Sequence, residues 1–107
     1  MPIPSITFRV EASLLNDFKL VAKRNNRTAT MLVRDFMLAY LKDDGEVWAL
    51  NLLSDFNDVN EKGFDDKLSV KASKDLIAAF QDKVEANEHV YSEIMRCAIR
   101  KYLIDMH

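Results

Sequence analysis

The side chains that most often perform catalysis or bind metals are few in this chain and far apart. Cys97 is the single cysteine, and His89 and His107 are the only two histidines. A structural zinc site normally needs four such ligands, so we expect no metal site. A lone cysteine also excludes an intramolecular disulfide and is typical of a reducing compartment.

Other signatures of enzymes are missing as well. Gly45 and Gly63 are the only glycines, and they lie too far apart to form one glycine-rich phosphate loop. Acidic residues are numerous but scattered, and no nucleophile lies beside a base in a pattern typical of an active site. We therefore expect a protein that is not an enzyme and that uses no cofactor.

Charge is distributed unevenly along the chain, although the net charge is only −2. Residues 1–42 carry +4, residues 43–66 carry −7, and residues 67–107 carry +1. Because local potential, rather than the total, steers an anionic partner, the acidic sum does not exclude a nucleic acid.

Length and composition indicate one globular domain. The chain has 107 residues, of which 49% are hydrophobic, enough for a buried core. Its longest apolar runs fall far short of the roughly 20 residues that span a bilayer. No basic-then-apolar leader follows Pro2 and Pro4, so we expect a cytoplasmic protein without a membrane contact.

An internal repeat organises the chain. Shifting the sequence by 62 positions superimposes two apolar patterns over about 40 residues without a gap. The matched positions include Ile6 with Leu68, Phe8 with Val70, Phe18 with Phe80, Leu32 with Ile94, and Tyr40 with Tyr102. We divide the chain into a first repeat (1–42), an acidic linker (43–66) and a second repeat (67–107).

Each repeat predicts one strand followed by two helices. Polar and apolar residues alternate strictly over 5–10 and 67–72, the period of a half-buried strand. Apolar residues then recur at helical spacing in two successive segments of each repeat. Those of the first repeat are Leu14, Leu15, Phe18, Val21 and Ala22, then Leu32, Val33, Phe36, Met37, Tyr40 and Leu41. We expect the rings of Tyr40 and Tyr102 in the core, with their hydroxyls in water.

Helix ends are indicated by capping residues. Thr28 and Ser73 are good N-caps, whereas Glu11 and Val90 at the other two starts are not. We therefore expect Ser13 to cap the first of these helices instead, and the other to begin at Ser92. Asparagine tolerates the left-handed backbone of a helix stop, so we expect the first helix of each repeat to end at Asn25–Asn26 and at Asn87.

The linker is too apolar for a free tether. Val47, Trp48, Leu50 and Phe56 predict a short helix that packs on the rest of the molecule. Gly45 and Gly63 bracket this segment as helix breakers.

One repeat cannot be stable alone, because its strand has an unpaired edge and its helices have too little to pack on. Two repeats solve both problems if the strands pair antiparallel into a ribbon and the four helices share one core. The predicted fold is mainly α with a two-stranded antiparallel ribbon.

This strand-helix-helix order resembles the ribbon-helix-helix family, the Arc/MetJ/CopG-like DNA-binding proteins. The resemblance rests on Ile6 to Val10 and Thr28 to Arg34, and on Leu68 to Lys71 and Tyr91 to Arg96 in the second repeat. Most family members take the two copies from two chains. This chain resembles a fused, TraY-type version, which implies a monomer that forms a pseudo-dimer.

The resemblance implies how the chain would bind double-stranded DNA. In the family, the outer face of the ribbon enters the major groove and reads base edges. Here that face holds Ser5, Thr7, Arg9, Lys67, Ser69 and Lys71. The start of each second helix offers its N–H groups to a phosphate. These positions are Arg27, Thr28, Ala29 and Thr30, and Tyr91 and Ser92.

Two classes of function remain open. The first is a sequence-specific DNA-binding protein of a bacterium, phage or plasmid, acting as a repressor or as an accessory factor of a DNA-processing complex. The second is a protein–protein module, such as an antitoxin or a decoy, that keeps the fold without reading DNA. Self-association on DNA and a protein contact through the Trp48 segment are also open. Arg34 and Arg96, at matching positions, fit a surface salt bridge and a DNA-backbone contact equally.

Overall fold

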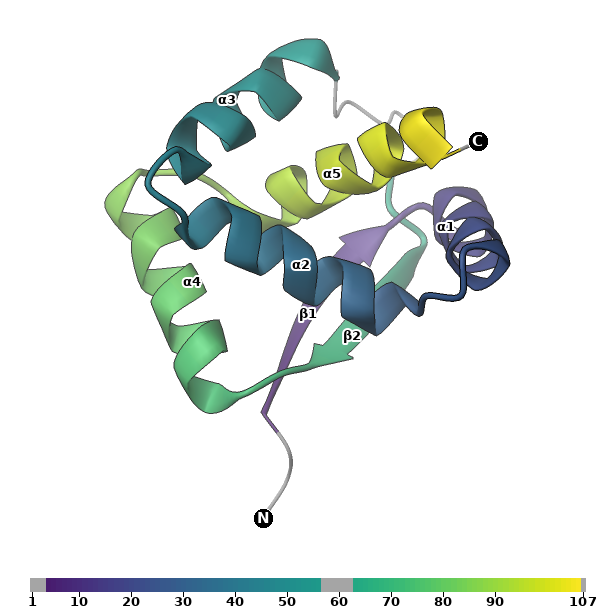
Figure 1. Ribbon diagram of the computed structural model, residues 1–107, viewed down its shortest axis with the longest axis horizontal. Coiled ribbons are helices and arrows are strands. Elements are labelled where there is room, and N and C mark those ends of the chain that lie inside the picture. Colours follow the sequence, from purple (N-terminus) through teal and green to yellow (C-terminus); the bar gives the residue numbers. More distant parts are fainter. Residues whose placement is uncertain (1–3, 57–62, 107) are drawn as a thin grey trace.

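The computed structural model describes residues 4–56 and 63–106 (Figure 1). Its elements are β1 (Ser5–Val10), α1 (Ala12–Arg24), α2 (Ala29–Leu41), α3 (Gly45–Asp55), β2 (Asp66–Lys71), α4 (Lys74–Ala86) and α5 (Tyr91–Met106). Helices α2 and α5 occupy the middle of the molecule, with α1 and α4 on opposite sides of them. The predicted class, mainly helical with a two-stranded antiparallel sheet, is confirmed.

The two strands form an antiparallel ribbon in one register. Ile6 lies opposite Val70, Thr7 opposite Ser69, and Phe8 opposite Leu68. Apolar side chains of both strands are buried and the intervening polar ones are exposed, as the alternation predicts. The second strand is Asp66–Lys71 rather than 67–72, because Val10 pairs with Asp66 at one end of the ribbon.

The core lies between the inner face of the ribbon and the helices. Its largest fully buried side chains come from α1, α2, α4 and α5, and Val10 and Val70 contribute from the strands. Helix α2 packs against α4, while α1 packs against α5. One face of the ribbon is therefore covered by helices, and the polar face is left to solvent.

Tyrosine rings join these helix pairs. Tyr40 meets Phe80 edge-on with centroids 5.5 Å apart, and Tyr102 meets Phe18 edge-on at 5.7 Å. Asn87 Nδ2 donates to the Tyr40 hydroxyl at 2.9 Å. The Tyr102 hydroxyl likewise accepts from an asparagine, at 3.3 Å. The Tyr40 ring lies in the core as predicted, and the half-buried Tyr102 ring packs against the core. The prediction of a wet hydroxyl was wrong for Tyr40, because this side chain is fully buried and its hydroxyl accepts from Asn87.

Two of the predicted helix starts are confirmed and two are wrong. Thr28 accepts a hydrogen bond from Met31 N, and Ser73 accepts one from Leu76 N. Helix α1 begins at Ala12, before Ser13. Helix α5 begins at Tyr91, one residue before Ser92.

A linker residue explains the early start of α1. The Ala12 N–H donates to Asp65 Oδ1 at 2.8 Å, so a carboxylate just before β2 satisfies one of the first N–H groups of the helix. A negative charge at a helix N-terminus is also favourable.

The turns between the paired helices follow the repeat but differ in one residue. Asn26 has φ 59° and Glu88 has φ 58°, both in the left-handed region. Asn25 and Asn87 are the C-caps that precede them. In the second repeat the left-handed residue is therefore Glu88, not Asn87 as predicted.

The short linker helix is confirmed as α3. Gly45 is its first residue, and it lies so close to α2 that an added Cβ would stand 1.7 Å from the Tyr40 carbonyl oxygen. The predicted breaker is thus a close-packing position. Trp48 is half-buried, with its ring centroid 6.5 Å from that of Phe36. Among residues 4–56 and 63–106, no helix is both long and apolar enough to cross a membrane.

Candidate nucleic-acid interface

The six residues predicted to read bases lie on one exposed face of the ribbon. We call this set the outer face. All six are exposed, and the register places them as three directly opposed pairs. The pairs are Ser5 with Lys71, Thr7 with Ser69, and Arg9 with Lys67. The structure therefore brings together every side chain that the alternation predicts for this face.

Thr7 and Ser69 form the middle of the outer face. Their hydroxyl oxygens are 2.7 Å apart, within hydrogen-bonding distance. The Ala72 N–H donates to Pro4 O, so positions 4 and 72 are a hydrogen-bonded pair of the ladder. Because such pairs alternate along an antiparallel ribbon, Thr7 and Ser69 are a non-hydrogen-bonded pair, whose side chains stand closer together.

Arg9 is exposed, but hydrogen bonds hold its side chain in one orientation. Its Nε and Nη2 atoms both donate to the carbonyl oxygen of Phe64, at 3.1 and 3.0 Å. Phe64 lies just before β2, so a linker residue fixes an outer-face side chain. The repeat pattern could not predict this contact.

Helix α5 fixes the edge of β1 through two backbone carbonyls. Arg96 Nη1 donates to Arg9 O at 2.8 Å, and the Tyr91 hydroxyl donates to Thr7 O at 2.8 Å. The side chain of Arg96 is only 5% exposed, so the prediction of a surface or DNA-backbone contact was wrong at this position. At the matching position on α2, Arg34 is exposed. The two halves of the ribbon are therefore supported differently.

The predicted phosphate-binding positions lie at the starts of α2 and α5. Thr28 is exposed and is the N-cap of α2, with Ala29 and Thr30 half-buried in the first turn. Arg27 forms an ion pair with Asp35 of the same helix, so its charge is partly neutralised. Tyr91 and Ser92, the first two residues of α5, are half-buried, and the Tyr91 hydroxyl is engaged by β1 as described above.

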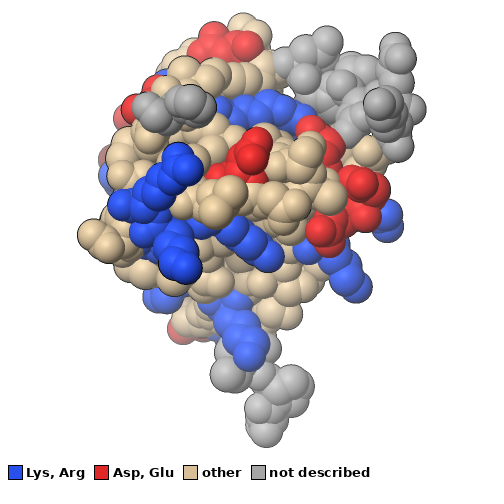
Figure 2. All heavy atoms as spheres, turned by 90° about the vertical axis from the view of Figure 1, so that its right-hand side faces the viewer, with Lys and Arg blue, Asp and Glu red and all other residues tan. Residues whose placement is uncertain are grey.

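The charges around the outer face are of both signs. Arg9, Lys67 and Lys71 are its cations, and the exposed Asp65 and Asp66 lie at one end of β2. On the side of the molecule that carries α1, Figure 2 shows Lys and Arg side chains in several separate places between other residues, with Asp and Glu side chains among them and several of these toward the right. Positive and negative side chains are therefore interspersed on this side of the molecule.

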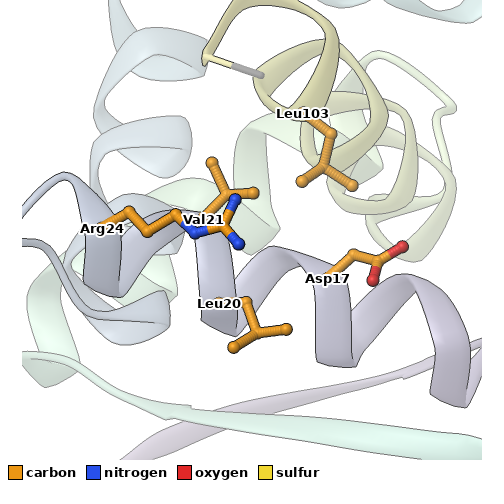
Figure 3. A pocket seen from close by; sticks show the side chains of 5 residues that line it. All are labelled: Asp17, Leu20, Val21, Arg24 and Leu103. Carbon is orange, nitrogen blue, oxygen red and sulfur yellow. The ribbon is translucent and has the colours of Figure 1, made fainter.

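The molecule also has hollows away from the outer face. Asp17, Leu20, Val21, Arg24 and Leu103 surround one of about 250 Å³ between α1 and α5 (Figure 3). Cys97 is buried. In the part of the chain that the structure describes, no group of three or more His, Cys, Asp or Glu side chains is placed to hold a metal ion.

The chemistry of the outer face is that of hydrogen-bond donors and cations on a rigid, narrow support. Hydroxyls, one guanidinium and two ammonium groups can contact anions and polar edges. No family model, curated protein or solved structure matches this chain. Its function must therefore be inferred from its own residues.

Proposed function

We propose that the chain is two fused β-α-α units related by an approximate two-fold axis, as in a ribbon-helix-helix dimer. The register of the ribbon supports this arrangement. Thr7 and Ser69 lie directly opposite each other, and they are also the residues that the 62-position shift superimposes. A two-fold axis between them would exchange β1 with β2 and leave the register unchanged.

Contacts among the helices support the same symmetry. The Tyr40–Phe80 pair corresponds to Tyr102–Phe18 under the 62-position shift, and each pair joins the first repeat to the second. The bond from Asn87 to Tyr40 corresponds in the same way to the 3.3 Å bond to Tyr102. Repeat-equivalent contacts that cross between the units are expected of a dimer-like core.

We propose that the chain binds double-stranded DNA in a sequence-specific manner through the outer face. The observation that carries this proposal is the arrangement of six exposed polar residues as three opposed pairs, on a two-stranded ribbon whose other face is core. A two-stranded ribbon fits the width of the major groove, where each base pair presents a distinct set of donors and acceptors. Exposed polar side chains on such a ribbon can reach those base edges.

Each outer-face residue has a chemically suitable partner. Arg9 can donate two hydrogen bonds to guanine O6 and N7, and the hydroxyls of Thr7 and Ser69 can serve several bases. Lys67 and Lys71 can contact guanine or a phosphate. The helix starts at Thr28 and at Tyr91 would position the protein on the DNA backbone, because N–H groups there and the helix dipole favour an anion.

The bound site should be non-palindromic. An exact two-fold site requires identical side chains at the positions that the two-fold axis relates. Here the axis would relate Arg9 to Lys71 and Ser5 to Lys67, so the two ends of the ribbon carry different side chains. A perfectly palindromic minimal site contacted by a single chain would contradict this reading. Such a protein would act in the cytoplasm as a repressor or as an accessory factor of a plasmid or phage DNA-processing complex.

Selection from random duplexes tests the proposal. The protein is incubated with the pool at a stated salt concentration, bound duplexes are enriched, and affinities are measured for the parent, Arg9→Ala and Lys71→Ala. Each substitution should weaken the selected site by about 1–3 kcal/mol and leave binding to unrelated duplex much less affected. Lys101→Ala is the matched control, because this exposed lysine lies on α5 and pairs with Asp105.

Two outcomes would contradict DNA binding. The first is that no duplex is enriched over the random pool. The second is that the outer-face variants bind the selected duplex as the parent and Lys101→Ala do. Either result would favour a protein-binding module that keeps the fold without reading DNA.

A further inference from the structure

We propose that Phe64 is a positioning residue for Arg9, and that it makes one end of the outer face more selective than the other. This inference rests on the proposed DNA-binding function, and it predicts which base pairs of the bound site the protein reads most stringently. We define the Arg9 end as Arg9 with Lys67, and the Lys71 end as Lys71 with Ser5.

Phe64 is connected to Arg9 directly and also through Arg96. Its carbonyl oxygen accepts from Arg9 Nε and Nη2, and its ring lies under the Arg96 guanidinium, 3.8 Å from the ring centroid. Arg96 in turn donates to Arg9 O. The backbone of Arg9 and its side chain are thus both connected to the residue that precedes Asp65.

The segment that carries Phe64 has a second anchor. Asp65 Oδ1 accepts from the Ala12 N–H at the start of α1. The stacked ring and the carboxylate together hold the Phe64 carbonyl beside β1 from two directions. A cation stacked on an aromatic ring and shielded from water interacts more strongly than an exposed pair, and Arg96 is 5% exposed.

The Lys71 end has no comparable support. Within residues 4–56 and 63–106, neither Lys71 nor Ser5 has a side-chain hydrogen bond or an ion pair. Arg34, which matches Arg96 in the first repeat, is exposed on α2. Lysine is also a flexible point charge, whereas arginine is a planar fork of donors. The Lys71 side chain must therefore be ordered by the DNA itself.

The Phe64 contact leaves Arg9 able to read guanine. A guanidinium has five N–H groups, and the carbonyl accepts from Nε and from one N–H of Nη2. One N–H group of Nη1 and the second one of Nη2 point side by side at the far end of the guanidinium. These end-on donors can form the pair of bonds to O6 and N7, so orientation and readout are compatible.

Order in the free protein increases discrimination at the Arg9 end. A side chain that is already oriented loses less freedom on binding, and it cannot easily swing to an alternative acceptor when the base is wrong. We expect single base-pair changes under the Arg9 end to reduce affinity about 3- to 10-fold more than changes under the Lys71 end. Loss of the Phe64 contacts should remove that difference.

The first measurement is made without DNA. The heteronuclear ¹⁵N NOE of Arg9 Nε is recorded for the parent, for Phe64→Ala, and for the double variant Phe64→Ala/Asp65→Ala, which removes both anchors. The parent should show a rigid Nε, the single variant a looser one, and the double variant a freely moving one. Phe56→Ala is the matched control: it removes a half-buried linker ring that packs beside Leu52 and Cys97.

The second measurement uses the selected duplex and its single base-pair variants. Phe64→Ala should reduce discrimination under the Arg9 end about 3- to 10-fold, with no change under the Lys71 end and none in Phe56→Ala. A mobile Arg9 Nε in the folded parent, or equal losses at both ends, would overturn the role of Phe64. The two proposals can also fail separately. If Arg9 Nε is rigid in the parent and looser in the variants, but the protein enriches no duplex, then Phe64 positions Arg9 and the proposed DNA binding and its selectivity are refuted.

Discussion

Tyr40 and Tyr102, at equivalent positions of the two repeats, provide a matched pair of substitutions with unequal expected costs. Tyr40 is fully buried, and its hydroxyl accepts from Asn87 Nδ2 at 2.9 Å and lies 3.1 Å from His89 Nδ1. Tyr40→Phe therefore breaks two contacts of a buried hydroxyl, and the half-buried Asn87 amide loses that partner. A typical intramolecular hydrogen bond contributes about 0.5–1.5 kcal/mol, so the loss of both contacts should lower the free energy of unfolding by about 2 kcal/mol.

Tyr102→Phe should cost much less. The hydroxyl of this half-buried side chain accepts from Asn25 Nδ2 at the longer distance of 3.3 Å. Asn25 Nδ2 also donates to Val21 O at 2.9 Å, so it keeps a partner after the substitution. We expect a loss of about 0.5 kcal/mol, the lower end for an intramolecular hydrogen bond.

Urea denaturation followed by circular dichroism measures both costs. The two variants should unfold with the parent's m-value, so that the midpoints report stability directly. At about 4–8 °C per kcal/mol for a domain near this size, the two melting temperatures should differ by several degrees. Equal costs, or a larger cost for Tyr102→Phe, would refute the reasoning from burial and hydrogen-bond partners.

Three further predictions concern the ribbon, the linker and the assembly. Phe8 is 3% exposed, so Phe8→Ala should lower the free energy of unfolding by about 3–5 kcal/mol. Arg9→Ala should lower it by about 1 kcal/mol or less. If urea denaturation gives the reverse order, the strand is shifted by one residue. Gly45→Ala should cost about 1–3 kcal/mol, because the new Cβ would clash with the Tyr40 carbonyl; an unchanged melting temperature would contradict the close packing of α3 on α2. Light scattering should give the 12.3 kDa mass of one chain, and an obligate dimer that never yields a folded monomer on dilution would indicate exchanged strands.

Periodicity was enough to predict the elements and the outer face. Ile6, Phe8 and Val10 alternate with polar residues, and burial requires that the polar set face outward. The helical stripes likewise predicted that the rings of Tyr40 and Tyr102 pack inward, and Tyr40 is buried while Tyr102 packs against the core. These features follow from local patterns, because the side chains of a strand or helix face fixed directions.

Contacts made by the linker could not be predicted in the same way. Asp65 satisfies the start of α1, and Phe64 stacks under Arg96, although neither residue belongs to the repeat. Arg34 and Arg96 match in sequence position, yet only Arg96 has such a ring beside it. A repeat indicates what two halves share, and it carries no information on the residues that make them differ.

The ribbon has a consequence for the protein at low abundance. Both of its strands come from one chain, so its formation is an intramolecular step. The stability of a fold assembled from two chains falls as the chains are diluted, because mass action favours separation. We therefore expect the folded fraction to be independent of dilution, so that a cell holding only a few copies of the chain would still contain a complete ribbon.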